Sequence, residues 1–471
     1  MRARHAVLLA LLFAWEGVAY ADLTHDTVSG SAIERVSVQG ASGEPREVAW
    51  AELASPKAPG LFTVRFRAKG EAVLVPHCNS RERVLIDGVV KDPGSKGPLV
   101  LPLGDDQPHE IAIEIKASAY EKRLACSEPA RVGAIIRTTD GLTRMRFTSP
   151  HAAKGPPAST GGGTGNRPDG GGEAVVFVPG GHDLKRPATV LVGTHPWNGG
   201  PWTYAAYSEL LDEAGKKDVV LLMPSGLGNS LYVADAEDEV MRALDALGTE
   251  LAIDRQRVSI WGASMGGAGA TTIAFHHPDR FAFVASYFGD SRFDLNTYVK
   301  NVLGGEEGAK RVNCLDVLEN ARHLPVFLVH GEDDHTSPMK QSTMLFDAMK
   351  KAGFTVSLER APGMGHEGPL VVKHIRHVVD HAASAVAPTR PSRVSFRSVR
   401  GSDTEAYGVR LVRVGEGDAF VDLERREDGI HVLAAEGVLQ IVLAKDALGA
   451  KGEEPIKLDA PRTKTAVRWA P

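Results

Sequence analysis

The chain has 471 residues, about three times the length for which one hydrophobic core is expected, so it should fold as more than one domain. Hydrophobic residues make up 43% and charged residues 24%, the mixture of an ordinary globular protein, which excludes a disordered or fibrous chain. The formal charge of −5 at pH 7 is spread without a Lys/Arg-rich run, so nucleic acid is not an expected partner.

The first residues have the pattern of a targeting sequence. Arg2 and Arg4 precede an apolar run over residues 6–14, and small residues follow up to Ala21. This pattern predicts a signal peptide, residues 1–21, because the apolar run is too short to span a bilayer. We therefore expect export to the periplasm or the extracellular space. A cytosolic protein with an apolar start is the alternative.

Short runs of alternating apolar and polar residues precede residue 150. They predict strands at 33–38, 62–66, 72–75, 84–90 and 111–115. Asp87-Gly88 lies between apolar residues, which is a strong local signal for a hairpin. We expect residues 22–150 to form a β-sandwich that resembles jelly-roll modules, and its role is either structural or carbohydrate contact.

Three cysteines are present. An exported protein folds in an oxidising compartment, and Cys78 and Cys126 both lie in the N-terminal region, so they are the predicted disulfide pair. The bridge would stabilise that region by roughly 4 kcal/mol through loop entropy. Two reduced buried thiols are the alternative. Cys314 stands alone, and no Cys/His cluster predicts a metal site.

Residues 151–172 are rich in Gly, Pro, Ser and Thr, which predicts a flexible linker. Beyond it the apolar runs become nearly continuous, as in buried parallel strands. They alternate with helical patterns at 236–251, 265–276 and 340–351. This alternation predicts a doubly wound, mostly parallel sheet over residues 173–387. Strand-like alternation returns near the end and predicts a small β domain at 392–471.

Gly262-Ala263-Ser264-Met265-Gly266 follows a predicted buried strand and precedes a predicted helix. In this context Gly-x-Ser-x-Gly is typical of a nucleophile elbow, a sharp turn in which side chains at both glycines would collide with backbone. Ser264 is the predicted nucleophile. The helix that starts there would direct its positive end at a developing oxyanion.

A serine hydroxyl needs a base, and the base needs an acid to orient it. The strand predicted at 326–329 ends in the acidic loop Glu332-Asp333-Asp334, which should hold that acid at the carboxyl edge of the sheet. His366 follows in a loop flanked by small residues and is the predicted base. The chain order is then Ser, acid, His, as the α/β-hydrolase fold requires.

Several stretches resemble landmarks of the α/β-hydrolase superfamily, specifically of its secreted esterases akin to polyhydroxybutyrate depolymerases, feruloyl esterases and prolyl-oligopeptidase-like proteins. They are Gly262–Gly269, His277–Phe281, His330-Gly331 and Gly365-His366. The resemblance covers roughly residues 173–387. In that group the acid stands four residues after the His of the His-Gly pair, which implies Asp334, with Asp333 as the alternative.

The same resemblance implies an oxyanion hole built from two backbone amides. The first would be the amide of Met265, directly after the nucleophile. The second should come from the loop after the strand at 189–192, where this chain has His195-Pro196 in place of the usual His-Gly. Proline has no amide hydrogen, so Trp197 is the expected donor.

Together these assignments predict an exported serine hydrolase that cleaves carboxylic esters through an acyl-enzyme and needs no cofactor. The compact catalytic region favours an esterase over a serine peptidase of the prolyl-oligopeptidase-like type, which stays an alternative. The β domains at both ends fit a substrate that is a polymer or a polysaccharide-linked ester, by analogy. A catalytically silent binding protein on the same fold is the third interpretation.

Overall fold

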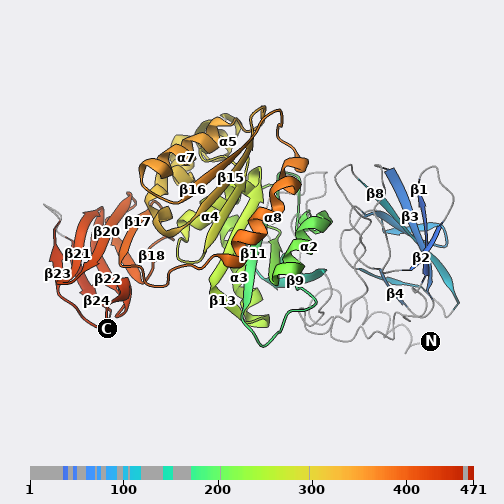
Figure 1. The fold of residues 1–471 in the computed structure, drawn as a ribbon, viewed down its shortest axis with the longest axis horizontal. Helices are drawn as coiled ribbons and strands as arrows, with labels where there is room; N and C mark the ends of the chain where they lie inside the picture. The colour runs from blue at the N-terminus through green and yellow to red at the C-terminus, as the bar shows by residue number, and fades with distance from the viewer. Residues whose placement is uncertain are drawn as a thin grey trace.

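The computed structural model describes residues 35–40, 46–49, 60–68, 72–75, 81–92, 99–103, 107–117, 142–151, 171–201, 203–295, 297–459 and 465–470. The predicted signal peptide and the Cys78–Cys126 pair lie outside these residues. The described chain forms N-terminal sheets, a central α/β unit and C-terminal sheets, laid out in that order along the long axis of the molecule (Figure 1).

The N-terminal strands pair antiparallel. A six-stranded sheet has the order β2-β1-β3-β8-β5-β6, and β4 pairs with β7 separately. The predicted hairpin is present, because Asp87 and Gly88 both have positive φ between β5 and β6. The bounds are β1 (Arg35–Gly40), β2 (Arg46–Ala49), β3 (Gly60–Ala68), β4 (Ala72–Val75), β5 (Arg81–Ile86), β6 (Val89–Asp92), β7 (Leu99–Pro102) and β8 (His109–Ala117).

The central sheet has eight strands in the order β16-β15-β14-β13-β11-β12-β10-β9. The six strands from β11 to β16 run parallel, while β10 and β9 pair antiparallel at one edge. Every residue of β12, β14 and β15 is buried, as expected for strands covered on both faces. The bounds are β9 (Leu142–Thr148), β10 (Gly171–Phe177), β11 (Ala188–Thr194), β12 (Val219–Pro224), β13 (Ile253–Ala263), β14 (Phe283–Tyr287), β15 (Val326–Gly331) and β16 (Val356–Ala361).

The edge strand β9 corrects a predicted domain boundary. It falls within the range 22–150 assigned to the N-terminal sandwich, but all seven of its residues pair with β10 of the central sheet. Gly171 and Gly172, predicted as linker, belong to β10. A Cβ atom on Gly172 would meet the ring of Phe147 and the carboxylate of Glu239, so glycine is needed here for close packing.

Helices cover both faces of the central sheet and create two cores. Ile260 of β13 belongs to the core that includes side chains of α3, α4 and α7, whereas its neighbour Trp261 belongs to the core that includes side chains of α2 and α8. This is the doubly wound arrangement predicted. The helical elements are η5 (Tyr204–Ala206), α2 (Ser208–Lys217), α3 (Asp235–Glu250), α4 (Met265–His276), η6 (Phe293–Leu295), α5 (Thr297–Val302), α6 (Glu306–Lys310), η7 (Cys314–His323), α7 (Lys340–Lys351) and α8 (Gly368–Ser384).

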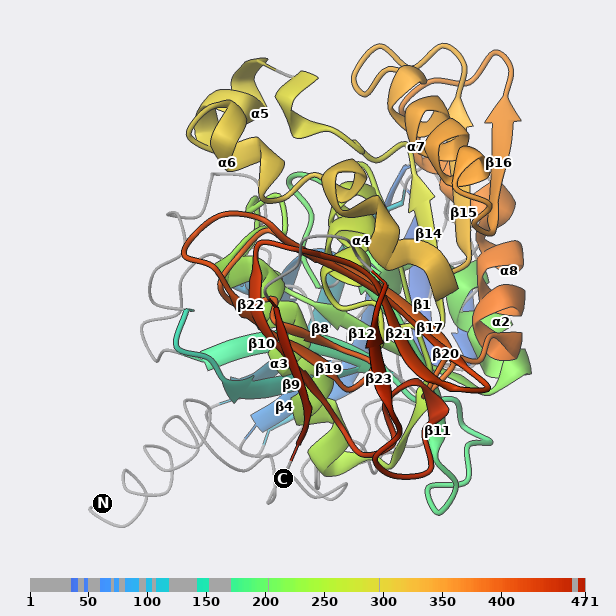
Figure 2. The ribbon, with the colours of Figure 1, turned by 90° about the vertical axis from the view of Figure 1, so that its left-hand side faces the viewer.

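The C-terminal strands form two four-stranded sheets, β17-β20-β21-β23 and β18-β19-β22-β24, seen in front in Figure 2. Phe396, Val421 and Ile441 belong to one hydrophobic core that both sheets share. The bounds are β17 (Arg393–Ser398), β18 (Glu405–Ala406), β19 (Val409–Arg413), β20 (Ala419–Arg426), β21 (Gly429–Glu436), β22 (Val438–Leu443), η8 (Ala447–Gly449), β23 (Ile456–Leu458) and β24 (Ala466–Trp469).

Candidate active site

Ser264 occupies a sharp turn between β13 and α4. Its backbone has φ 58° and ψ −123°, a conformation that side-chain-bearing residues rarely adopt. A Cβ atom on Gly262 would meet the Thr194 hydroxyl and the Gly266 backbone, and one on Gly266 would meet the Thr194 carbonyl. Glycine is therefore required at both positions, as the elbow pattern predicts.

Ser264, His366 and Asp334 lie within hydrogen-bonding reach of one another. The Ser264 Oγ is 2.7 Å from His366 Nε2, and His366 Nδ1 is 2.7 Å from Asp334 Oδ2. They come from the loops after β13, β15 and β16, which end at the same edge of the parallel sheet. Because the Asp334 carboxylate accepts from Nδ1–H, Nε2 is free to accept the Ser264 hydroxyl proton.

The Asp334 side chain is fully buried and held by several donors. Its Oδ1 accepts the amide hydrogens of Thr336 and Ser337 at 2.8 and 2.9 Å. Burial alone would raise the pKa of Asp334, but hydrogen bonds from His330 and His366 outweigh it and hold the pKa well below its usual value. The carboxylate is therefore charged. Asp333, the alternative acid, is exposed instead.

His330 orders the loop that carries Asp334. The buried ring donates from Nε2 to the Ser337 carbonyl at 2.7 Å, and its Nδ1 lies 2.7 Å from the Ser342 hydroxyl. With Nε2 protonated, Nδ1 accepts from Ser342 in the neutral ring. The loop thus keeps Asp334 aimed at His366 through contacts that do not involve the reacting atoms.

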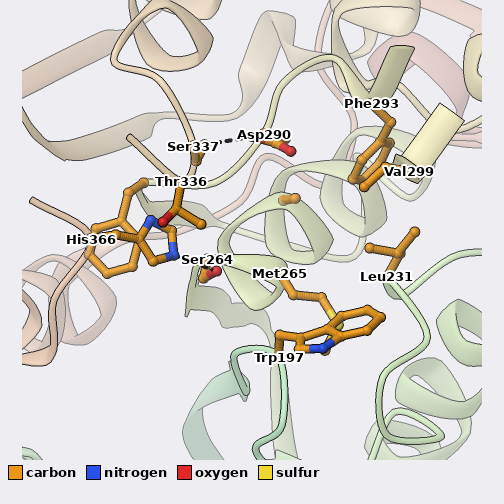
Figure 3. Close-up of a pocket in the computed structure, with 12 residues that line it drawn as sticks. Trp197, Leu231, Ser264, Met265, Asp290, Phe293, Val299, Thr336, Ser337 and His366 are labelled. Carbon is orange, nitrogen blue, oxygen red and sulfur yellow. Dashed lines mark hydrogen bonds between the residues drawn. The ribbon is translucent and has the colours of Figure 1, made fainter. Parts of the chain in front are cut away.

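The two expected oxyanion donors lie on the same side of Ser264. The amide of Met265 is in the first turn of α4, where helix N–H groups have no intrahelical acceptor. Trp197 lies in the loop after β11, and its side chain lies beside Met265 (Figure 3). Within the described ranges, the Trp197 amide hydrogen forms no backbone–backbone hydrogen bond.

Two buried tyrosines position this loop through hydrogen bonds that the sequence alone does not predict. The Tyr204 hydroxyl donates to the Thr194 carbonyl at 2.8 Å and accepts the Ala263 amide hydrogen at 3.0 Å, which ties the loop to the nucleophile strand. The Tyr232 hydroxyl accepts the His195 amide hydrogen at 2.8 Å. Burial raises the pKa of both tyrosines, so both stay neutral.

A cavity of about 380 Å³ opens beside the nucleophile (Figure 3). Most of its lining is apolar, and its polar groups are concentrated on one side. Such a cavity suits a small acyl or alcohol group. The lining residues are Trp197, Leu231, Ser264, Met265, Ala268, Phe288, Asp290, Phe293, Val299, Thr336, Ser337 and His366.

The described residues contain no group of three or more His, Cys, Asp or Glu side chains arranged to hold a metal ion. Cys314 is buried and free, and burial raises the pKa of its thiol to about 12, so it is no nucleophile. No helix within the described ranges is long and apolar enough to cross a membrane.

Comparison with known proteins finds one family model that matches part of the chain. Residues 232–386 match the prolyl oligopeptidase family. Among solved structures, the S-formylglutathione hydrolase from Agrobacterium tumefaciens is 18% identical with a TM-score of 0.43, covering 52% of this chain and 96% of its own. A ferulic acid esterase is 16% identical with a TM-score of 0.41, covering 52% and 98%.

The acylaminoacyl peptidase of Pyrococcus horikoshii is 18% identical with a TM-score of 0.42, covering 68% of this chain and 52% of its own. Likeness at these levels carries no argument about the substrate. The family match is different, because it includes both the elbow and His366. It confirms the predicted resemblance: residues 232–386 resemble the prolyl oligopeptidase family, as expected for an α/β-hydrolase of the esterase and prolyl-oligopeptidase-like group.

Proposed function

We propose that this protein is an exported serine hydrolase that cleaves carboxylic esters through Ser264, His366 and Asp334. The proposal is carried by one observation: two consecutive 2.7 Å hydrogen bonds link a buried carboxylate, an imidazole and a serine hydroxyl at the mouth of an apolar cavity. This is the geometry needed to activate a hydroxyl as a nucleophile.

In the first step the Ser264 oxygen attacks the ester carbonyl carbon while His366 Nε2 takes the hydroxyl proton. The carbonyl oxygen becomes an oxyanion, which the amide hydrogens of Met265 and Trp197 stabilise. When the tetrahedral intermediate collapses, the C–O bond to the alcohol breaks and His366 returns the proton to the departing oxygen. The acyl group is then bound to Ser264, and the alcohol leaves.

In the second step a water molecule attacks the acyl-enzyme carbonyl and His366 accepts one of its protons. The new intermediate collapses, the bond to Ser264 breaks, and the serine oxygen recovers its proton from His366. The carboxylic acid leaves. Through both steps the charged Asp334 holds the Nδ1–H tautomer and stabilises the imidazolium that forms at His366.

Export and the substrate class complete the proposal. The targeting pattern at residues 1–21 supports a periplasmic or extracellular location. The separate N-terminal and C-terminal sheets fit flanking modules, the first a jelly-roll-like sandwich with carbohydrate contact, of an enzyme that acts on a polymer or a polysaccharide-linked ester.

Hydrolysis of short p-nitrophenyl esters by the purified protein, compared with aminoacyl anilides, tests the reaction class. We expect ester turnover that Ser264→Ala lowers by about 10⁶-fold in kcat. Ser259→Ala is a matched control, because Ser259 is a fully buried serine of the same strand and does not line the cavity. Faster anilide cleavage would favour a serine peptidase, and no turnover by folded protein would favour the silent binding protein.

A further inference from the structure

The cavity beside Ser264 contains one carboxylate for which the proposed reaction has no use. Asp290 is the one acidic residue among those that line the cavity, and no Lys or Arg is among them. In the view of Figure 3, Ser264 and Met265 lie between Asp290 on one side and Trp197 on the other. A substrate bound to Ser264 would therefore lie close to this charge.

The fold holds Asp290 in place. It follows β14 through Phe288 and Gly289, and a Cβ atom on Gly289 would meet the backbone of Gly267 and Ala268 in the first turn of α4. The Asp290 Oδ1 accepts a hydrogen bond from the Ser337 hydroxyl at 2.6 Å. Because Ser337 also donates its amide to Asp334 and accepts from His330, Asp290 is positioned by the loop that carries the catalytic acid.

No cationic side chain forms an ion pair with Asp290 in the part of the chain that the structure describes. The Ser337 hydroxyl is its one hydrogen-bond donor among the described residues. The rings of His330 and His366 act on Asp290 only through the longer-range charge interaction, and His366 is already engaged by Asp334 and Ser264. Burial raises the pKa of Asp290, because desolvation penalises the charged form of the carboxyl group. A cationic ligand would remove this penalty.

The rest of the lining suits a cation as well. The aromatic side chains of Trp197, Phe288 and Phe293 line the same cavity. Aromatic faces attract ammonium groups, and this attraction is strongest where water is excluded. A carboxylate that shares a cavity with aromatic rings is a combination that can recognise an ammonium group on a small substrate.

Resting on the proposed ester hydrolysis, we propose that Asp290 selects esters that carry a positively charged ammonium group next to the scissile bond. The ammonium group binds between the Asp290 carboxylate and the aromatic lining while Ser264 attacks the ester carbonyl. The charge can be on the acyl part, as in an aminoacyl ester, or on the alcohol part, as in a choline ester. Asp290 thereby determines specificity, whereas Ser264, His366 and Asp334 carry the reaction.

Two matched substrate pairs test this assignment on the full-length protein. The first pair is alanine p-nitrophenyl ester and propionate p-nitrophenyl ester, which differ in the ammonium group of the acyl part. The second pair is acetylcholine and its neutral carbon isostere, which differ in the charge of the alcohol part. Each ratio of kcat/KM is divided by the ratio of the spontaneous hydrolysis rates, so that intrinsic reactivity cancels.

We expect the wild-type protein to prefer the charged ester of at least one pair by about 10- to 100-fold. This is the range for a hydrogen bond to a charged group, as the alanine ester could form, or for a desolvated cation–π contact, as the choline ester could form. The pair that shows the preference identifies which part of the ester carries the charge. Asp290→Asn should bring this ratio towards one. Glu332→Gln, which removes an exposed carboxylate from the nearby acid loop, is the matched control and should keep the ratio.

The outcomes separate the two proposals. Equal wild-type rates within both pairs would overturn the role of Asp290 and leave the ester hydrolase standing. A preference that Asp290→Asn retains, in protein shown to be folded by fluorophosphonate labelling, would also overturn it. The wild-type comparison needs no variant, so it decides even if Asp290→Asn does not fold. Absence of any ester turnover would overturn the proposed function, and the role of Asp290 with it.

Discussion

Two clusters in this molecule pair histidine with a buried carboxylate: one is the candidate catalytic site, and the other is structural. At the candidate active site His366 Nδ1 lies 2.7 Å from Asp334. At the junction with the C-terminal sheets, Glu237 lies 3.1 Å from His276 Nδ1 and 2.9 Å from His277 Nε2. Residue type and distance alone therefore do not distinguish a catalytic pair from a structural one.

The difference lies in what else the carboxylate and the ring contact. Arg400, from the C-terminal unit, binds both oxygens of Glu237 at 2.8 and 2.7 Å and also pairs with Asp403. Burial alone would raise the pKa of Glu237, but His276, His277 and Arg400 hold it well below its usual value. The second nitrogen of His276 is buried without a partner among the described residues.

By contrast, the second nitrogen of His366 faces the Ser264 hydroxyl beside an open cavity. A histidine–carboxylate pair becomes chemically useful when its far nitrogen meets a nucleophile that a substrate can reach. The Glu237 cluster instead neutralises charge within a closed interface, where it holds two units of the chain together. Three sets of variants and one pH comparison test the roles of the two clusters and of the site around Ser264.

The largest effect is expected from removing the charge of the acid at each cluster. Asp334→Asn should lower kcat for ester hydrolysis by about 10⁴-fold, because an amide no longer stabilises the imidazolium or its tautomer. Glu237→Gln, the same change at the other cluster, should alter kcat by less than about tenfold. Steady-state kinetics on one ester measure both. If both variants lose kcat to a comparable extent, the Glu237 cluster is not purely structural.

Arg400→Met should affect the stability of the protein rather than its kcat. It leaves Glu237 and Asp403 without their shared cation and should lower the free energy of unfolding by about 3–5 kcal/mol, the usual cost of breaking a buried ion pair. Urea unfolding measures this loss, with Arg410→Met, which changes an exposed arginine of β19, as a surface control. A change below about 1 kcal/mol would show that Arg400 is not needed at the junction.

Trp197→Pro should lower kcat by about 10²–10³-fold, since it removes one proposed oxyanion donor. Trp197→Ala is the matched control, because it keeps the amide hydrogen and removes only the indole ring. The two variants should differ by at least about tenfold in kcat. If the two variants lose kcat equally, the Trp197 amide is not the second oxyanion donor.

The smallest effect concerns pH. The pKa of Glu237 is lowered in the folded protein below its ordinary value of 4.5, so its contribution to stability is present above that pH and is lost as the pH falls further. The difference in unfolding free energy between the wild type and Glu237→Gln should therefore be larger at neutral pH than in acid below that value. If the difference in unfolding free energy between the two proteins stays constant across this pH range, the pKa of Glu237 is not lowered by folding.

The elbow and the order of the three side chains could be predicted from the sequence, because each is encoded locally. Gly262 and Gly266 surround Ser264 directly after a buried apolar strand, and His366 and Asp334 lie in loops that follow recognisable strands. In such cases, position at a strand end predicts position at the sheet edge.

Other features could not be predicted because they depend on tertiary packing. Glu237 and Arg400 are 163 residues apart, and no local pattern links them. Tyr204 and Tyr232 act through single hydroxyl groups whose partners are backbone atoms of distant segments. The strand β9 resembles the strands before it in pattern, and only its pairing with β10 assigns it to the central sheet.

The central claim is that Ser264 is the activated nucleophile. Labelling of the folded full-length protein with a fluorophosphonate, followed by peptide mapping, tests it most directly. If Ser264 is the nucleophile, we expect one label per chain on the peptide that contains Ser264, and none in Ser264→Ala. Folded wild-type protein that takes up no label, or takes it up at another serine, would show that Ser264 is not the activated nucleophile.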